Sequence, residues 1–224
     1  MIVATVAVVV LAAVVIGGVI WTNSSKNSTS GQAITPQTAA AGLDSASERQ
    51  GVTVVSGSNT AKLKLTIYAD FLCPYCGQLQ ANYGPQMEQL IQAGTLQVTY
   101  QMIPLLNDRS DPPGYSLDSA NASLCAADQG KFTAFHDSLY KSQPAEGQRG
   151  YDNAQLIKLG NDLGITSPDF ATCVNNGTYK AQINTAYQKI ASDPSFQGTP
   201  TVLHNNQQVN WTDPNWLTNL LNAA

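Results

Sequence analysis

A chain of 224 residues is long enough to bury a full hydrophobic core as one domain with a large insertion. Charged residues make up only 12% of it and the formal net charge is −4, with no basic cluster, so we expect no nucleic-acid partner. The cysteines form an even set of four, which is typical of disulfides in an oxidising compartment.

The N-terminus predicts a membrane anchor. Every residue from Ile2 to Trp21 is apolar, small or Thr, and the first charge is Lys26. A helix of that length spans roughly 30 Å, the thickness of the hydrocarbon core of a bilayer. We therefore assign residues 1–22 to an uncleaved, single-pass transmembrane helix. A cleaved signal peptide is the alternative, but the apolar run is long for one and no Ala-x-Ala site follows.

The charges around this span do not set its orientation, because no Lys or Arg precedes it and Lys26 follows it. We place the rest of the chain outside the cytoplasm because the cysteine pattern suits an oxidising compartment. Residues 23–50 are rich in Ser, Thr, Asn, Gln, Gly and Ala without hydrophobic periodicity, which predicts a flexible linker.

A strand–helix–strand unit opens the folded part. A short strand is expected at Val52–Val55, and Leu63–Ala69 alternates apolar residues as a second strand does. Apolar residues at helical spacing then predict a helix from Pro74 to about Ala93, and Leu96–Ile103 predicts the next strand. This order indicates a βαβ unit in an α/β fold.

A helical block then interrupts the strands, after a loop over Leu105–Tyr115. Apolar residues at spacings of three and four predict helices near 116–129, 131–142, 152–163, 167–174 and 178–192. Strands are expected again at Thr201–His204 and Gln208–Trp211, followed by a helix that begins at Asp213-Pro214. The frame would thus comprise residues 51–106 and 193–224, with residues 107–192 as an inserted helical domain.

The motif that carries chemistry is Cys73-Pro74-Tyr75-Cys76, placed between a strand and a helix. Pro74 suits the first helical position, so Cys73 falls at the N-cap, where unpaired N–H groups and the helix dipole stabilise a thiolate. Cys76 lies one turn further, close enough to release a mixed disulfide. A zinc ribbon would need a second close pair, but Cys125 and Cys173 are far apart in the sequence, and a purely structural bridge in so tight a loop would add little stability.

Four passages resemble the DsbA-like thioredoxin-fold oxidoreductases, in particular their membrane-anchored branch in Gram-positive bacteria of the actinobacterial type. They are DFLCPYCG at 70–77, QGKF at 129–132, FHDSLY at 135–140 and GTPT at 198–201. The likeness covers roughly residues 50–222. It implies a thioredoxin fold with a helical domain inserted between the βαβ unit and the strand that follows a cis-proline.

The resemblance implies a role for each site residue. Cys73 would be the solvent-facing nucleophile and Cys76 its buried resolving partner. Pro200 would be cis, with the backbone of Thr199 pairing with the substrate chain, and Tyr75 would contact substrate between the cysteines. No cofactor and no metal are implied.

One departure in sequence and a second cysteine pair complete the comparison with that family. Ile67 stands where relatives carry a buried acid that moves protons to the inner thiol, so water or another group must do so here; Asp70 is expected to cap the active-site loop. Cys125 and Cys173 would form a structural disulfide, the alternative being two free buried thiols. His136 and His204 are expected to be ordinary structural residues.

The sequence therefore predicts a dithiol oxidase that introduces disulfide bonds into unfolded exported proteins and is reoxidised by a membrane redox partner. We expect a monomer, and a potential between about −120 and −200 mV. A reductase or isomerase using the same cysteines is one alternative. A non-catalytic, chaperone-like module that binds peptides beside Pro200 is another, and replacing Cys73 with Ser separates enzyme from binder.

Overall fold

The computed structural model describes residues 29–223. The predicted anchor at residues 1–22 and the first part of the predicted linker lie outside this described part. Within residues 29–223, no helix combines the length and the apolar character needed to span a membrane.

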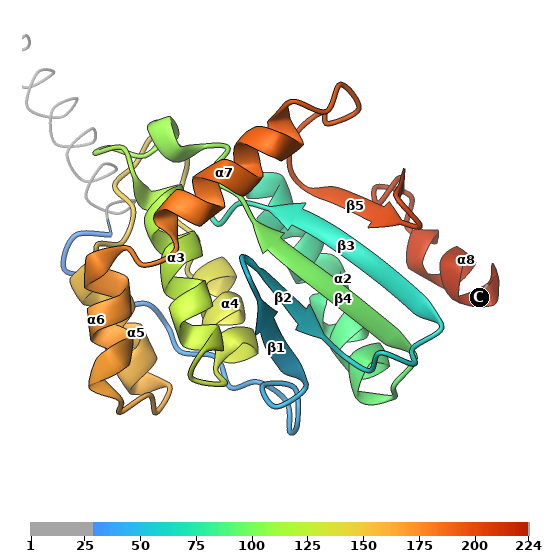
Figure 1. Ribbon diagram of the computed structural model, residues 1–224, viewed down its shortest axis with the longest axis horizontal. Helices are drawn as coiled ribbons and strands as arrows, with labels where there is room; N and C mark the ends of the chain where they lie inside the picture. The colour runs from blue at the N-terminus through green and yellow to red at the C-terminus, as the bar shows by residue number, and fades with distance from the viewer. Residues whose placement is uncertain (1–28, 224) are drawn as a thin grey trace, which may run out of the picture.

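A six-stranded sheet forms the frame, in the order β1-β2-β4-β3-β5-β6 (Figure 1). The central strands β3 and β4 are parallel and are joined by helix α2, which gives the predicted βαβ unit, while the other neighbours pair antiparallel. The bounds are β1 Ser47–Gln50, β2 Thr53–Ser56, β3 Leu63–Ala69, α2 Pro74–Gln92, β4 Leu96–Met102, β5 Thr201–His204 and β6 Gln207–Gln208.

One face of this sheet forms the core. Leu63, Leu65 and Ile67 of β3 are buried, whereas Lys64 and Thr66 between them are more exposed, as the two-residue period of a strand requires. Helix α2 lies behind the sheet in Figure 1 and packs against β4. The cysteine motif lies between the end of β3 and the first turn of α2.

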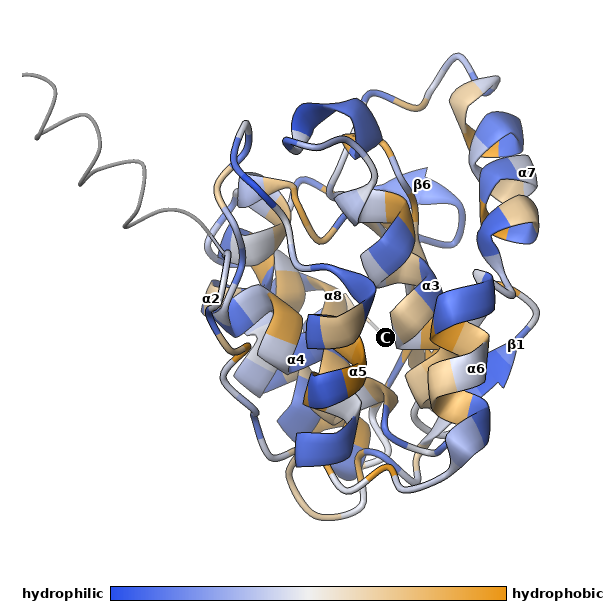
Figure 2. Cartoon of the chain, turned by 90° about the vertical axis from the view of Figure 1, so that its left-hand side faces the viewer, coloured by the Kyte–Doolittle hydropathy of each residue, from blue (hydrophilic) through white to orange (hydrophobic). Residues whose placement is uncertain are grey.

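Five α-helices stand between β4 and β5, after a 3-10 turn at Asn107–Arg109. They are α3 Tyr115–Ala127, α4 Phe132–Lys141, α5 Asn153–Asp162, α6 Pro168–Asn176 and α7 Lys180–Ala191. Helix α3 lies at the centre of this group, contacts α4, α5, α6 and α7, and is buried along almost all of its length. Figure 2 shows hydrophilic and hydrophobic residues side by side on α5 and α6, as expected for helices with one face on α3.

Residues 29–46 form a strap on the folded domain, so the prediction of a flexible linker up to residue 50 was wrong. The side chains of Ile34 and Leu43 are 2% and 1% exposed. Ser47–Gln50 is a strand paired with β2. The polar composition suggested a linker because Ile34 and Leu43 are the two large buried apolar residues of the strap, while polar side chains and backbone groups make its other contacts.

Hydrogen bonds connect the strap with both halves of the molecule. On the helical insertion, the Gln37 N–H donates to Ser138 Oγ at 2.8 Å, and Asp44 Oδ1 accepts from the Ala134 N–H at 3.2 Å. On the frame, Gln92 at the end of α2 donates to the carbonyl of Ala41. The strap therefore joins the insertion to the frame.

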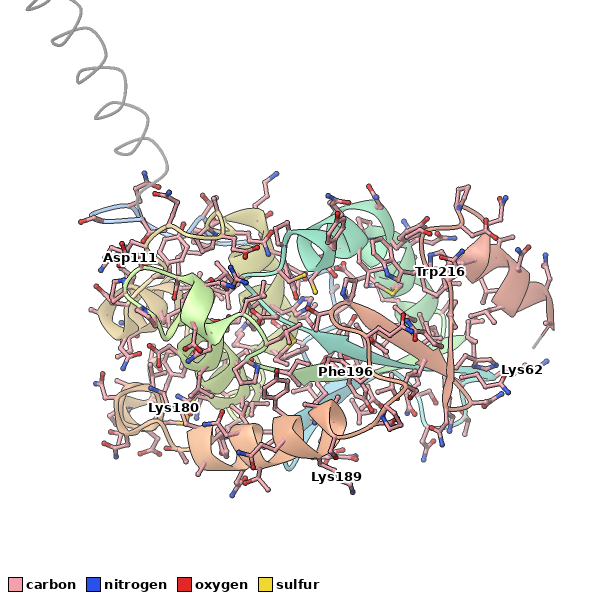
Figure 3. The ribbon with its side chains drawn as sticks, turned by 90° about the horizontal axis from the view of Figure 1, so that it is seen from above. Lys62, Asp111, Lys180, Lys189, Phe196 and Trp216 are labelled. Carbon is pink, nitrogen blue, oxygen red and sulfur yellow. A yellow bond between two sulfur atoms is a disulfide. The ribbon has the colours of Figure 1, made fainter. Side chains whose placement is uncertain are left out.

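The C-terminal elements differ slightly from the prediction. Strand β6 is limited to Gln207–Gln208, and α8 begins at Trp216 and ends at Ala223. Asp213 instead closes a turn before the helix, because its carboxylate accepts from the Asn215 N–H. In Figure 3, Trp216 marks the start of α8, on the opposite side of the view from Lys189 of α7, and its ring packs against Tyr83 of α2 with centroids 5.4 Å apart.

Candidate active site

The cysteine motif lies where β3 ends and α2 begins. Cys73 is the N-cap residue of α2 with an extended backbone, and Pro74 occupies the first helical turn. Proline is favoured there because it has no N–H to leave unpaired and its φ is already helical. The Cys76 and Gly77 N–H groups donate to the Cys73 carbonyl at 3.0 and 3.2 Å, which starts the helix at this residue.

The Gly198–Thr201 segment faces Cys73 from the start of β5. The Thr199–Pro200 peptide bond is cis, and the Cys73 thiol donates to the Thr199 carbonyl oxygen at 3.3 Å. The structure thus brings together the two segments that the sequence placed far apart. Tyr75, between the cysteines, is 60% exposed and is free to meet another molecule.

The cysteines differ from the expectation in their exposure. Both are free thiols, but Cys73 is only 4% exposed and Cys76 only 2%. Cys73 is therefore not openly solvent-facing, because the Thr199 carbonyl lies against its sulfur.

The pKa values of the two thiols are shifted in opposite directions. The pKa of Cys73 is lowered to about 6, mainly by a hydrogen bond from Cys76. Burial raises this pKa, whereas hydrogen bonds with Thr199 and with the N–H groups of Cys76 and Tyr75 lower it. Burial, followed by the hydrogen bond to Cys73, raises the pKa of Cys76 well above its usual value. The neighbouring thiol therefore stabilises the Cys73 thiolate more than the helix terminus does, which was the cause expected from the sequence.

Asp70 caps the active-site loop, as predicted, and does more. Its Oδ1 accepts from the Leu72 N–H at 2.8 Å and from the Ser116 hydroxyl at 2.7 Å, and its Oδ2 accepts from the Leu106 N–H at 2.8 Å. The carboxyl is 1% exposed, and burial raises its pKa to about 6 against the opposing effect of these hydrogen bonds. Asp70 thus joins the end of β3 to α3 of the insertion, while Ile67 is an apolar core residue.

Gln143 also reaches this loop, although it was not among the predicted site residues. Its amide donates to the carbonyls of Phe71 and Cys73. Gln143 follows α4 and lies 70 residues from Cys73 along the chain. A tertiary contact of this kind leaves no local pattern in the sequence. The one sequence signal of a close contact here is Gly77, whose lack of a side chain leaves space for the amide.

The second cysteine pair lies away from this site. Cys125 of α3 and Cys173 of α6 form a disulfide with an S–S distance of 2.00 Å, in the pairing that the resemblance implied. The bond therefore lies wholly within the helical insertion.

Both histidines contact neighbouring side chains or backbone of the fold. His136 is 3% exposed and packs against the rings of Phe71, Tyr100, Phe132 and Tyr140, with its Nδ1 2.9 Å from Asp137 Oδ1. His204 Nδ1 contacts the carbonyl of Lys64 on the neighbouring strand.

Within residues 29–223, no cluster of three or more His, Cys, Asp or Glu side chains could hold a metal ion. A hollow of about 700 Å³ lies between α7 and the open face of the sheet, lined among others by Lys189 and Phe196 (Figure 3). Neither Cys73 nor Cys76 lines it, so this hollow is separate from the cysteine motif.

A family model described as thioredoxin matches residues 49–223. The chain belongs to the thioredoxin family. Its fold is similar to that of reduced DsbA from Mycobacterium tuberculosis, with a TM-score of 0.66 and 27% identity over 77% of this chain and 92% of that one. The reduced disulfide bond oxidoreductase DsbG from the same organism gives a TM-score of 0.65 and 28% identity, covering 77% and 86%. The chain is thus a DsbA-like domain of the thioredoxin family.

Two sequence relatives are a kinase and a putative protein-disulfide oxidoreductase. The chain is 29% identical over 180 residues to the serine/threonine-protein kinase PknE of Mycobacterium tuberculosis, covering 75% of this chain and 31% of that protein. A putative protein-disulfide oxidoreductase of Rickettsia conorii is 23% identical, over 69% of this chain and 54% of its own length. The chain therefore spans about a third to a half of these curated relatives.

Proposed function

We propose that this chain is a thiol–disulfide oxidoreductase that introduces disulfide bonds into exported proteins through Cys73 and Cys76. The observation that supports it is the pairing of a thiol whose pKa is lowered to about 6 with one whose pKa is raised, beside a cis-proline segment. A low pKa makes Cys73 a good leaving group, and a high pKa makes Cys76 keep its proton.

The proposed exchange has two steps. In the oxidised protein, a substrate thiolate attacks Cys73 Sγ, the Cys73–Cys76 bond breaks, and Cys76 leaves and takes up a proton. The second thiolate of the substrate then attacks the substrate sulfur that is bonded to Cys73. This forms the substrate disulfide, and Cys73 leaves as a thiolate. Two electrons pass from the substrate to the cysteine pair, and a disulfide of a redox partner must accept them to complete the cycle.

Thr199 supports this role through its backbone. Its carbonyl lies 3.3 Å from Cys73 Sγ, so a chain that pairs with this backbone would bring its own sulfur against Cys73. Tyr75, exposed beside it, would cover the same segment of substrate. These contacts involve backbone and one ring, which suits substrates of varied sequence.

The test is the redox potential, measured by equilibrating the full chain with glutathione buffers and trapping free thiols. Relative to the thioredoxin thiol, whose pKa is about 7, a Cys73 pKa of about 6 stabilises the reduced form by at most about 1 kcal/mol at pH 7, which corresponds to about 20 mV. Added to the thioredoxin value, this gives about −250 mV, a smaller oxidising shift than the sequence led us to expect. A potential at or below the thioredoxin value of about −270 mV would overturn the oxidase direction.

A reductase or isomerase is the second candidate, and one observation favours it. The Cys73 pKa of about 6 lies nearer to the value of thioredoxin, about 7, than to that of a strong oxidant, about 3.5. Incubation with a reduced dithiol peptide and with a peptide that carries a disulfide separates the two. The oxidase converts the first faster, and the reductase converts the second.

We further propose that residues 1–22 anchor the domain outside the cytoplasm, that it acts as a monomer, and that its redox partner lies in the membrane. The apolar run Ile2–Trp21 and the disulfide between Cys125 and Cys173, which needs an oxidising compartment, support the location. A membrane-impermeant thiol reagent should label Cys73 in intact cells treated with reductant. Labelling that appears only after lysis would contradict this topology.

A further inference from the structure

The side chain of Gln143 reaches from the helical insertion into the turn that delivers Cys73 to α2. Its Nε2 lies 3.0 Å from the Phe71 carbonyl oxygen and 2.9 Å from the Cys73 carbonyl oxygen. Carbonyl oxygens only accept hydrogen bonds, so the amide must present its NH₂ group to both of them. One side chain thus holds both ends of this turn.

Gly77 makes the approach of Gln143 possible. A Cβ at Gly77 would lie 2.3 Å from Gln143 Oε1, which is closer than real Cβ contacts come. The backbone of Gly77 belongs to the ordinary helix α2, where alanine would otherwise be preferred. The space that the amide occupies, and not the backbone conformation, therefore accounts for glycine at this position.

The bond to Cys73 acts on the group that starts the helix. The Cys73 carbonyl also accepts from the N–H groups of Cys76 and Gly77, so its direction sets the first turn of α2. The Tyr75 and Cys76 N–H groups in that turn are among those that stabilise the Cys73 thiolate. The NH₂ end of the Gln143 amide also brings positive partial charge to the turn.

We propose that Gln143 is a positioning residue for exchange at Cys73, holding the Phe71–Cys73 turn so that the sulfur stays at the N-terminus of α2 and against Thr199. The proposal deepens the proposed function and rests on it only in taking Cys73 as the exchanging sulfur. Through this side chain the helical insertion acts on the reactivity of a cysteine in the frame.

The test compares Gln143→Met and Gln143→Ala with the wild-type full chain. Met keeps most of the volume without any donor, so it reports on the hydrogen bonds even if the Ala variant fails to fold. The pKa of Cys73, followed through the ultraviolet absorbance of the thiolate, should rise by about half to one unit, as expected for the loss of about one hydrogen bond. The redox potential should become more negative.

Gln155 is a matched control. Its Nε2 also donates to two backbone carbonyls, those of Thr29 and Gln32, both at 2.7 Å, but it does so at the strap. Gln155→Ala should lower the melting temperature and leave the Cys73 pKa at the wild-type value. If the Gln143 variants behave in the same way, losing stability with an unchanged Cys73 pKa and potential, the proposal is overturned.

A double-variant cycle gives the sharpest result. Gly77→Ala should push the amide aside and raise the Cys73 pKa in the wild-type background, but have no further effect when Gln143 is already Ala. Additive shifts would contradict the proposal. Because this readout is the pKa of a thiol and not enzyme activity, it stays valid if the wild-type protein proves to have no oxidase activity.

Discussion

Cys73 and Cys76 lie within one turn of α2 and remain free thiols, whereas Cys125 and Cys173 are 48 residues apart and bonded. A bond within one turn removes little freedom from the unfolded chain, while one that closes a long loop removes much. The first pair is therefore suited to exchange and the second to stabilisation.

The surroundings of the two pairs add to this difference. Cys73 has the Thr199 carbonyl of the cis-proline segment 3.3 Å from its sulfur, and its own partner thiol stabilises it as a thiolate. Cys125 is 1% exposed on α3, and its partner is on a neighbouring helix of the insertion. The separation of the cysteines along the chain and the groups that face them therefore distinguish the two pairs.

The largest expected effect comes from the first pair. Cys73→Ser should abolish the oxidation of a reduced dithiol peptide, because no other described sulfur stands at a helix N-terminus beside the cis-proline segment. The matched control is the double variant Cys125→Ser with Cys173→Ser, which should retain the activity. The assignment of exchange to the first pair would be wrong if Cys73→Ser stayed active, or if the control variant lost its activity while remaining folded.

The same double variant should show the larger effect on stability. Closing a loop across 48 residues contributes about 4 kcal/mol to the unfolding free energy through chain entropy, so its loss should lower the urea midpoint strongly. The Cys73 pKa should remain at its wild-type value. An unchanged midpoint would show that α3 and α6 hold together without the bond.

A smaller effect is expected from Asp70, which joins the two regions. Its pKa is raised to about 6, so the folded protein binds more protons than the unfolded chain between about pH 4 and pH 6. Stability should be highest below this window and fall by about 3 kcal/mol as the pH rises through it. Glu88, whose pKa is raised to about 7 by burial and then by Asp137, adds a loss of the same sign.

Urea unfolding of the oxidised protein across this pH range measures the effect without a contribution from Cys73. Glu88→Gln removes one of the two carboxyl groups and leaves the part that belongs to Asp70. If the unfolding free energy of this variant rises between pH 4 and pH 6, folding stabilises the ionised form of Asp70 and its pKa is not raised.

Much of the fold could be predicted because the periodicity was local. Leu63–Ala69 was placed correctly from its alternation, and the start of α2 followed from Pro74 after Cys73. The five helices of the insertion each carry an apolar stripe for the same reason, since they all face a common core.

The contacts that join the two regions could not be predicted in this way. Asp70 was expected to cap its own loop, but its bond to Ser116 spans 46 residues, and the bond from Gln143 to Phe71 spans 72. The strap was missed because it is fastened mainly by polar groups such as those of Gln37 and Asp44, which have no period.

The strap also matters for anyone who wants to produce this domain alone. The family likeness begins at residue 49, and a boundary drawn there would discard Ile34 and Leu43, which are buried, and expose the apolar surface that they cover. It would also leave the Ser138 hydroxyl and the Ala134 N–H without the partners they have now. A shortened protein that begins before Thr29 keeps these contacts, so sequence likeness alone would set the cut about twenty residues too late.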